Sequence, residues 1–254
     1  MKRILLSGYN GKMGRVVAQT VSEREDCVVV AGFDIHAASE STVPVYAEPT
    51  EFEGAADVLI DFSHPSYFPK VLGFASARRM PVVVATTGLS TDQRKQLQQL
   101  SQVVPVFSSA NMSLGVNLIL ELCKKAAAVL SDSFDIEVVE MHHNQKIDAP
   151  SGTALMLADG IASVLPQKPH YMYDRHSQRK KREKNEIGIH SVRGGTIVGE
   201  HEVLFAGTDE VIAIRHSASS KRIFATGAIN AALFLSIQKP GLYDMSHLVS
   251  AIGG

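Results

Sequence analysis

A glycine-rich loop between a short apolar segment and a helical pattern constrains this chain more than any other feature. Residues 2–7 predict a buried strand, and the spacing Gly8-x-x-Gly11-x-x-Gly14 follows it directly. In that context the first glycine permits a tight turn, the second lets backbone approach a pyrophosphate, and the third lets helix and strand pack closely. The helix N-terminus offers N–H groups and a positive dipole to phosphates. The loop therefore predicts a dinucleotide-binding half rather than a simple turn.

The segments that follow predict a parallel sheet. Asp34 lies 20 positions after Gly14, at the end of a second strand over residues 28–33, where a ribose 2′-OH would be bound. Residues 58–62 and 81–86 predict further strands, with helical stretches between and after them. Continuous β-branched runs that alternate with helices are typical of a sheet covered on both faces. We expect a doubly wound, Rossmann-like α/β domain over the first ~110 residues.

Two later segments, Thr86–Gly88 and Ala110–Met112, each follow a strand. A nicotinamide would be bound at this edge of such a sheet. On the residues alone, simple turn chemistry explains these two segments equally well. Together with the glycine loop and Asp34 they complete the candidate cofactor-binding set: Gly8, Asn10, Gly11, Lys12, Met13, Gly14, Asp34, Thr86, Thr87, Gly88, Ala110, Asn111 and Met112.

The character of the sequence changes near residue 112. Residues 114–130 predict a long amphipathic helix, and residues 135–140 predict a strand. A helix over about 153–165 follows, and then strand-like runs at 187–193, 196–205 and 210–216. This pattern indicates a second, α+β domain with mixed or antiparallel pairing.

The last segment returns to a helix at 228–238. We expect residues 1–112 and 223–254 to form the dinucleotide-binding domain. Residues 113–222 would then form a domain for substrate binding and oligomerisation.

The densest group of chemically useful residues lies within residues 140–154. Two adjacent imidazoles, His142 and His143, and the ammonium of Lys146 precede a Pro-Ser-Gly-Thr turn that begins a helix. The serine or threonine of this turn can cap the helix, and its free N–H groups then form a carboxylate site. These groups indicate an anionic substrate with a proton donor beside it. The turn residues are Ser151, Gly152 and Thr153.

Other chemistries fit the sequence less well. Adjacent histidines rarely converge on one ion and no further ligand spacing occurs, so we predict no metal site. Ser151 as a nucleophile would need a G-x-S-x-G elbow, which is missing. Cys27 and Cys123 lack any CxxC or Cys/His spacing, and we expect buried free thiols.

The segment from Glu140 to Ala154 closely resembles the signature of the dihydrodipicolinate reductase family, also called 4-hydroxy-tetrahydrodipicolinate reductases. The resemblance runs almost the whole length of the chain. It also includes Gly8–Arg15, Asp61–Ser63, Thr86–Gly88, Ala110–Ser113, Arg193–His201 and Gly241–Met245. The resemblance implies a nicotinamide-dependent reduction that gives tetrahydrodipicolinate in diaminopimelate and lysine biosynthesis.

By position, the resemblance implies roles for individual residues. His142 and Lys146 correspond to the catalytic pair, which donates or relays a proton to the ring after hydride arrives. The residues implied to bind the dicarboxylate substrate are His143, Lys146, Ser151, Gly152 and Thr153. A homotetramer assembled through the sheets of the second domain is implied as well.

Met112 stands where many relatives carry Phe or another apolar residue. The chain departs from the family pattern at two places. Lys221 stands where relatives often have Arg. Lysine cannot reproduce a guanidinium fork, although Arg222 next to it could substitute. Asp34 is followed by Ile and His36, without the arginine expected to hold a 2′-phosphate. We therefore expect NADH or NADPH as cofactor, with NADH used at least as well.

Composition excludes some partners. With 25 basic and 26 acidic residues the net charge is −1, so no global field favours nucleic acid. The basic run over 175–184 is interpreted as a solvated, mobile loop near an acidic substrate. No stretch approaches the ~18–20 apolar residues of a membrane span, and the N-terminal apolar run is too short for a signal peptide. We expect a soluble, cytoplasmic protein.

Two other functions remain as alternatives. A catalytically silent cofactor sensor would keep the glycine loop but not the His-His-x-x-Lys and Ser-Gly-Thr groups. An amino-acid dehydrogenase resembling aspartate dehydrogenase is the alternative among enzymes.

Overall fold

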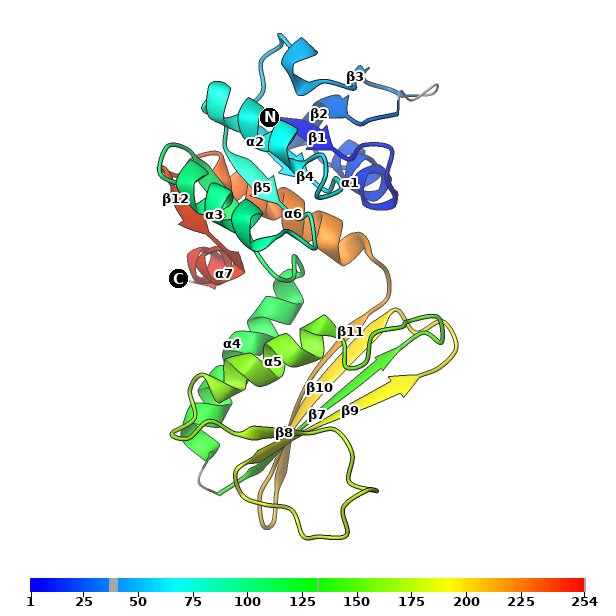
Figure 1. Ribbon diagram of the computed structural model, residues 1–254, viewed down its shortest axis with the longest axis vertical. Coiled ribbons are helices and arrows are strands. Elements are labelled where there is room, and N and C mark those ends of the chain that lie inside the picture. The colour runs from blue at the N-terminus through cyan, green and yellow to red at the C-terminus, as the bar shows by residue number, and fades with distance from the viewer. Residues whose placement is uncertain (37–40, 132, 254) are drawn as a thin grey trace. The chain divides into compact units, whose positions relative to one another are not determined.

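The computed structural model describes residues 1–36, 41–131 and 133–253, and the chain forms two compact units (Figure 1). The first unit comprises Met1–Ser113 and Lys221–Gly254, and the second comprises Leu114–Ser220. The chain leaves the first unit one residue later than expected and returns to it two residues earlier.

The first unit is built on a parallel sheet of seven strands in the order β12-β6-β5-β4-β1-β2-β3. The strands are β1 (Lys2–Ser7), β2 (Cys27–Phe33), β3 (Val45–Tyr46), β4 (Val58–Asp61), β5 (Val82–Val84), β6 (Pro105–Ser108) and β12 (Gly241–Tyr243). Every residue of β4 and β5 is buried, as expected of central strands covered on both faces. The order of strands reverses direction at β1, and ligands bind at such a switch point, outside the carboxyl ends of the strands.

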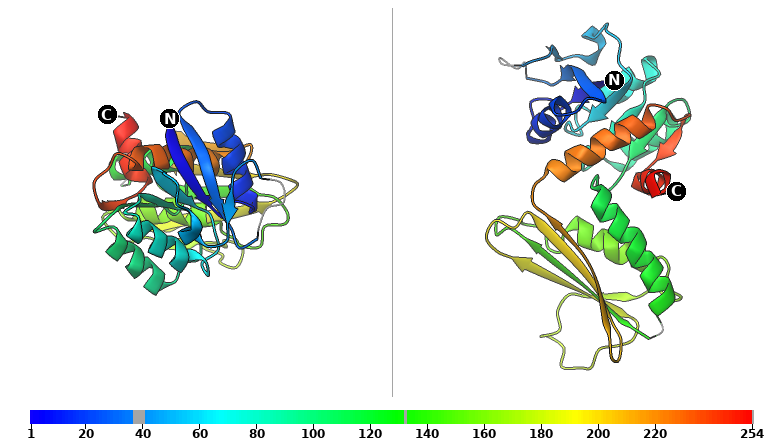
Figure 2. Two further views of the ribbon diagram at one scale, coloured as in Figure 1. Left: turned by 90° about the horizontal axis from the view of Figure 1, so that it is seen from above. Right: turned by 180° about the vertical axis from the view of Figure 1, so that it is seen from behind.

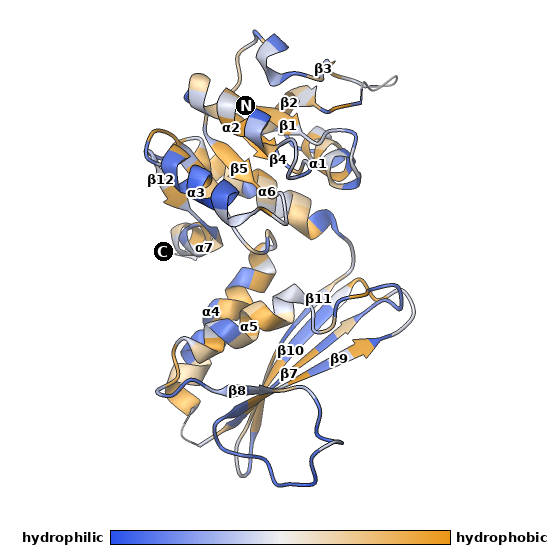
Figure 3. Cartoon of the chain, in the orientation of Figure 1, coloured by the Kyte–Doolittle hydropathy of each residue, from blue (hydrophilic) through white to orange (hydrophobic). Residues whose placement is uncertain are grey.

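Helices cover this sheet. They are α1 (Lys12–Ser22), α2 (Phe68–Ala77), α3 (Thr91–Leu100), α6 (Arg222–Leu235) and α7 (Met245–Gly253), with a 3₁₀ turn, η1, at Pro49–Glu51. Helix α6 packs against α1 and runs across β4, β5 and β6, and α2 packs against α3 (Figure 2). Helix α3 begins at a capping box, in which Ser90 and Gln93 each bond the other's backbone N–H. The apolar strands contrast with the polar surface of α3 (Figure 3). The doubly wound prediction is confirmed.

The second unit has a mixed sheet of five strands in the order β11-β10-β7-β9-β8. Its elements are α4 (Leu114–Leu130), β7 (Asp135–His142), α5 (Gly152–Ala162), β8 (His170–Met172), β9 (Glu186–Arg193), β10 (Gly199–Ala206) and β11 (Val211–Ala218). Strand β9 pairs in parallel with β7 and β8, whereas β10 pairs antiparallel with β7 and β11. Alternate residues of β7, β9 and β10 form one core with α4 and α5. The prediction of an α+β unit with mixed pairing is therefore confirmed.

Several element boundaries differ from the sequence expectation. Helix α6 begins at Arg222 instead of residue 228, because its first turns pack closely onto the first unit. At Gly227 a Cβ atom would lie only 1.6 Å from the carbonyl oxygen of Met112. The short strands β3, β8 and β12 were not predicted, because two or three residues form a strand only when a longer neighbour pairs with them.

The basic loop between β8 and β9 is hydrophilic throughout (Figure 3), but it is not simply solvated. Arg175 forms ion pairs with Glu137 and with Glu186, the second of which is fully buried. Arg182 bonds to Glu137 and Asp135, and its side chain is only 17% exposed. The interpretation as a solvated loop is wrong for Arg182, and Arg175, although 38% exposed, is held by ion pairs as well, because the buried Glu186 needs cationic partners.

Within the part of the chain that the structure describes, no helix is both long and apolar enough to cross a membrane. Cys27 and Cys123 are buried and free, as expected, and burial raises the pKa of the Cys27 thiol to about 11.

Candidate functional site

A cavity of about 830 Å³ lies at the carboxyl ends of the strands in the first unit. The loops after β1, β4, β5 and β6 supply most of its lining. Nine of the thirteen candidate cofactor residues line it: Gly11, Lys12, Met13, Thr86, Thr87, Gly88, Ala110, Asn111 and Met112. The structure thus brings the glycine loop and both later segments to one cavity.

The glycine loop has no room for side chains at two of its glycines. Gly8 has φ +75°, and a Cβ atom there would lie 2.7 Å from the carbonyl oxygen of Phe62. A Cβ atom on Gly14 would lie 2.1 Å from the carbonyl oxygen of Gly8. Close packing of β1, the loop and α1 therefore requires glycine at these two positions.

Asp34 lies at the end of β2, beside the glycine loop and outside the cavity lining. Its carboxylate accepts hydrogen bonds from the backbone N–H groups of Asn10, at 2.9 Å, and His36, at 3.1 Å. The Asn10 side chain donates to the carbonyl oxygen of His36 at 2.6 Å. These bonds bring Asn10 and Asp34 together although they lie far apart in the sequence.

A buried carboxyl group beneath the cavity ties two of its loops together. Asp61 is fully buried and accepts hydrogen bonds from the Thr86 hydroxyl, at 2.7 Å, and from the backbone N–H of Ser63, at 3.1 Å. Burial raises the pKa of Asp61. Asp61 therefore links the loops after β4 and β5 through these hydrogen bonds.

Sequence reasoning assigned no role to eleven further residues of the lining, among them Phe62, Ser63, Arg94, Phe224 and Leu242. Arg94 is a cation on α3 whose side chain has no hydrogen bond or ion pair to any described residue. Arg222, considered above as a substitute for an arginine at position 221, instead pairs with Glu23. Only the family motifs around residues 62 and 242 gave any sequence signal for this group.

In the second unit the candidate catalytic residues lie at the end of β7. Successive even-numbered residues of this strand face the helices, and Val138 belongs to the core. Glu140 and His142 continue that face beyond the core, toward the start of α5. Nδ1 of His142 lies 2.6 Å from Oε2 of Glu140, whose side chain is fully buried.

Neighbouring strands supply two residues that sequence reasoning did not single out. His201 lies opposite Glu140 on β10, and Arg193 lies opposite His142 on β9. Arg193 donates to both oxygens of Glu140, at 2.8 Å each. Burial by itself would raise the pKa of Glu140, but the bonds from Arg193, Ser191 and His142 outweigh it and lower that pKa to about 2. The Glu140 carboxylate is therefore charged at any physiological pH.

Ser151, and not Thr153, is the N-cap residue of α5. Its hydroxyl accepts a hydrogen bond from the backbone N–H of Ala154 at 3.1 Å, and its own backbone N–H donates to Glu140 at 3.1 Å. The hydroxyl also lies 2.9 Å from Nε2 of His201. Burial, followed by the nearby His142, lowers the pKa of His201 to about 4, so its imidazole is neutral at pH 7.

The approach to the first turn of α5 is open. A Cβ atom on Gly152 would have no neighbour within 4 Å. The N–H groups at a helix N-terminus attract an anion, and an open approach leaves space for one.

Lys146 lies in the turn between β7 and α5. Its Nζ atom is 2.8 Å from both carboxylate oxygens of Asp148, and its backbone N–H donates to the carbonyl oxygen of His143 at 3.1 Å. Arg193 closes the turn by donating to the carbonyl oxygen of Asp148 at 2.6 Å. Among the described residues, no hydrogen bond joins the side chain of Lys146, in the turn, to that of His142, at the end of β7.

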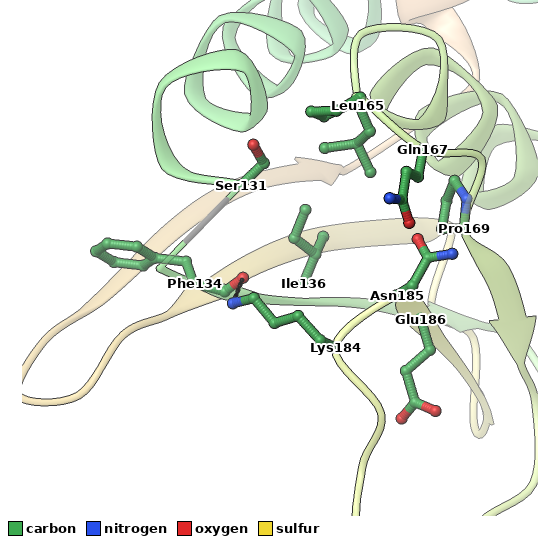
Figure 4. A pocket seen from close by; sticks show the side chains of 10 residues that line it. Ser131, Phe134, Ile136, Leu165, Gln167, Pro169, Lys184, Asn185 and Glu186 are labelled. Carbon is green, nitrogen blue, oxygen red and sulfur yellow. Dashed lines mark hydrogen bonds between the residues drawn. The ribbon is translucent and has the colours of Figure 1, made fainter.

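A second, smaller cavity of about 290 Å³ lies in the second unit, where Ile136 and Leu165 point toward one another beside Lys184 (Figure 4). No candidate site residue lines it. Over residues 1–36, 41–131 and 133–253 there is no group of three or more His, Cys, Asp or Glu side chains that could hold a metal ion.

The first unit fits a dinucleotide. The glycine loop of this unit leads into the N-terminus of α1, and the cavity continues toward the residues after β5 and β6. Lys12 lines the same cavity, and its ammonium has no ion pair with any described residue. Phosphate groups would meet backbone N–H groups and a cation at this end.

Comparison with known proteins gives consistent results for both units. The family model described as dihydrodipicolinate reductase, N-terminus, matches residues 2–112, and the model for its C-terminus matches residues 115–249. A 4-hydroxy-tetrahydrodipicolinate reductase from Caldanaerobacter subterraneus is 53% identical over 98% of both chains. One from Clostridium novyi is 43% identical over 99% of both.

Solved structures agree. A dipicolinate-bound dihydrodipicolinate reductase from Paenisporosarcina superposes with a TM-score of 0.81 and 26% identity, covering 96% of this chain and 97% of that one. A probable dehydrogenase from Thermotoga maritima, with a TM-score of 0.62 and 10% identity over 98% of this chain and 93% of that one, shares the fold.

Proposed function

The chain belongs to the dihydrodipicolinate reductase family, and from this premise we propose how its residues carry out the reaction. It is a nicotinamide-dependent oxidoreductase that reduces 4-hydroxy-tetrahydrodipicolinate to tetrahydrodipicolinate, with loss of the 4-hydroxyl group as water, in the biosynthesis of diaminopimelate and lysine. The observation that carries the assignment of roles is the hydrogen-bonded link from Ser151 through Glu140 to His142. It sets an imidazole beside the anion-attracting end of α5.

The first unit is the dinucleotide-binding domain in this proposal. When bound, the nicotinamide cofactor supplies the hydride that reduces the ring. The glycine loop and Lys12 hold the phosphates, Asp34 accepts hydrogen bonds from the adenosine ribose, and the segments Thr86–Gly88 and Ala110–Met112 hold the nicotinamide end. Asp34 makes NADH at least as good a cofactor as NADPH, because its charge opposes a 2′-phosphate.

The second unit binds the substrate. The first turn of α5, which Ser151 caps and Gly152 and Thr153 begin, attracts one carboxylate through its dipole and the N–H groups beyond Ser151. Lys146 and His143 add positive charge or hydrogen-bond donors for the substrate's carboxylates. The open space over Gly152 and the dipicolinate bound by the Paenisporosarcina enzyme support this site.

His142 and Lys146 supply the proton that the ring requires after hydride transfer. His142 is oriented through its Nδ1 by Glu140, which leaves Nε2 to exchange a proton. The ammonium of Lys146 stabilises negative charge in the same turn and can relay a proton. The two residues thus divide proton transfer and charge stabilisation.

We also propose a cytoplasmic homotetramer that assembles through the sheet of the second unit. Leu204, Val211 and Ala213 lie on the face away from α4 and α5, and the Val211 side chain is 63% exposed. An apolar patch left open to water on this part of the sheet favours association. Sedimentation should show a tetramer, and Val211→Glu should shift it toward smaller species; a monomer in the unmodified protein would reject this part.

The decisive test measures oxidation of NADH and NADPH with the product of the preceding synthase as substrate. Turnover with this substrate and none with aspartate and NAD⁺ is expected. Turnover of aspartate alone would favour the amino-acid dehydrogenase, and binding of cofactor without either activity would favour a silent sensor.

A further inference from the structure

Four N–H groups donate hydrogen bonds to the Glu140 carboxylate, which is fully buried, and the Ser191 hydroxyl adds a further interaction. Oε1 accepts from the backbone N–H of Ser151 and from Arg193, and Oε2 accepts from His142 and from Arg193. A carboxylate offers about four acceptor positions, so all of them are used. Such a network is costly to leave incomplete and rigid when complete.

We propose that Glu140 is a positioning residue that holds His142 in the tautomer with its proton on Nδ1 and its lone pair on Nε2. The inference rests on the proposed role of His142 as the residue that exchanges a proton with substrate. An ionised carboxylate can only accept hydrogen bonds, so the nitrogen 2.6 Å from it must donate. The free Nε2 is then the atom that takes up and returns a proton.

Arg193 keeps this arrangement in one orientation. A guanidinium has five donors and no acceptor, and its bidentate contact fixes the plane of the carboxylate. The same guanidinium bonds the carbonyl oxygen of Asp148, so the carboxylate and the substrate-binding turn share one anchor. Arg193 and the Ser151 N–H can only donate, and His142 donates in the same way because the ionised carboxylate has no proton to give.

The surroundings of His142 agree with a free Nε2. The ring of His201 lies 5.2 Å away, edge to face, and its imidazole is neutral at pH 7. It therefore adds no positive charge against an imidazolium at His142. A Cβ atom on Gly199 would come within 3.1 Å of Nε2, so glycine at this position keeps the atom clear.

Replacing Glu140 by Gln should reverse the tautomer of His142 rather than merely weaken the preference for one tautomer. Oε1 has two obligate donors, the Ser151 N–H and Nη2 of Arg193, whereas Oε2 has one, Nη1 of Arg193, so the amide oxygen is favoured at the Oε1 position. The amide NH₂ group then occupies the Oε2 position and faces Nδ1 of His142. A donor there forces Nδ1 to accept, which moves the ring proton to Nε2.

The experiment is ¹⁵N NMR of the full-length protein labelled at histidine, recorded above pH 8, with His142→Gln used to identify the His142 signals. The unmodified protein should show the Nδ1–H tautomer, and Glu140→Gln should show the Nε2–H tautomer. Glu121→Gln is the matched control, because it removes a surface carboxylate paired with Lys124 in the same unit; it should match the unmodified protein. An Nε2–H tautomer in the unmodified protein, or no change in Glu140→Gln, would overturn the proposal. The measurement on the unmodified protein tests the proposal even if Glu140→Gln does not fold.

Kinetics separate this inference from the proposed function. In Glu140→Gln we expect kcat to fall by ~10²-fold or more, the scale of a misoriented acid–base residue. The dissociation constant of pyridine-2,6-dicarboxylate should change by less than about 3-fold, since the first turn of α5 keeps its N–H groups. Normal turnover in His142→Gln would reject the role of His142 itself. Slow turnover in His142→Gln with normal turnover in Glu140→Gln would reject only the positioning role.

Discussion

The ammonium of Lys146 lies 2.8 Å from both carboxylate oxygens of Asp148, and this pair fixes a positive charge just before α5. The Lys146 side chain is 21% exposed, so water and substrate still reach it. We expect Lys146→Ala to lower kcat at least ~10²-fold, as for other positioned acid–base groups. Lys124→Ala, which removes a lysine of α4 paired with Glu121, is the control and should retain activity. Normal turnover of a folded Lys146→Ala protein would exclude a catalytic role.

Replacement of His142 should affect chemistry and spare cofactor binding. His142→Gln keeps a polar side chain but cannot exchange a proton, so turnover should slow. The candidate cofactor residues all belong to the first unit, and the dissociation constant of NADH, measured by fluorescence, should barely change. A strong loss of cofactor binding would mean that His142 belongs to a different site.

Gly152→Val should weaken carboxylate binding while leaving the fold intact. Pyridine-2,6-dicarboxylate should compete with substrate, and the valine side chain should raise its inhibition constant by covering the first turn of α5. No atom lies within 4 Å of a Cβ at this position, so no packing clash is expected. Gly73→Val, at an equally open glycine of α2, controls for placing valine in a helix. Competition with the nicotinamide cofactor alone would count against this carboxylate site.

The carboxylate of Asp34 should set cofactor choice. A 2′-phosphate beside it would meet a like charge, at a cost on the order of 1–2 kcal/mol in a partly exposed site. At about 1.4 kcal/mol per tenfold this favours NADH by about 5–30-fold, and neighbouring cations such as Lys12, Arg15 and protonated His36 reduce the preference. The test is kcat/KM for both cofactors at two ionic strengths, with Asp34→Ala alongside. A preference above ~10-fold for NADPH in the unmodified protein would show that the cations dominate.

His201 should make stability depend on pH. Burial lowers its pKa from 6.5 to about 4, so between these values the unfolded chain binds a proton that the folded chain does not. Above about pH 6.5 this group does not lower the free energy of unfolding. As the pH drops toward 4 it lowers that free energy by up to about 3 kcal/mol. The melting temperature of the unmodified protein should therefore fall more steeply from pH 6.5 to 5 than that of His201→Gln. His176→Gln, at an exposed loop position, should behave like the unmodified protein; equal slopes in all three would disprove the prediction.

Much of the fold and part of the site could be predicted because their signals are local. The turn from β1 into α1 needs Gly8 for its φ of +75° and Gly14 because a side chain there would clash with the carbonyl oxygen of Gly8, and the sequence carries both glycines. The strand period of two places Glu140 and His142 on one face. The capping chemistry of Ser151 likewise depends on a backbone N–H three residues away.

Only the tertiary structure decided which strands lie beside β7, and so which side chains complete the site. Arg193 reaches Glu140 from 53 residues away along the chain, and His201 reaches Ser151 from 50 residues away. Strand pairing over such distances depends on burial of the whole sheet and not on any local preference. A buried carboxylate also requires donors, but its own sequence neighbourhood does not say where they come from. The candidate proton-transfer residue was therefore visible in the sequence, and the network that orients it emerged only from the folded sheet.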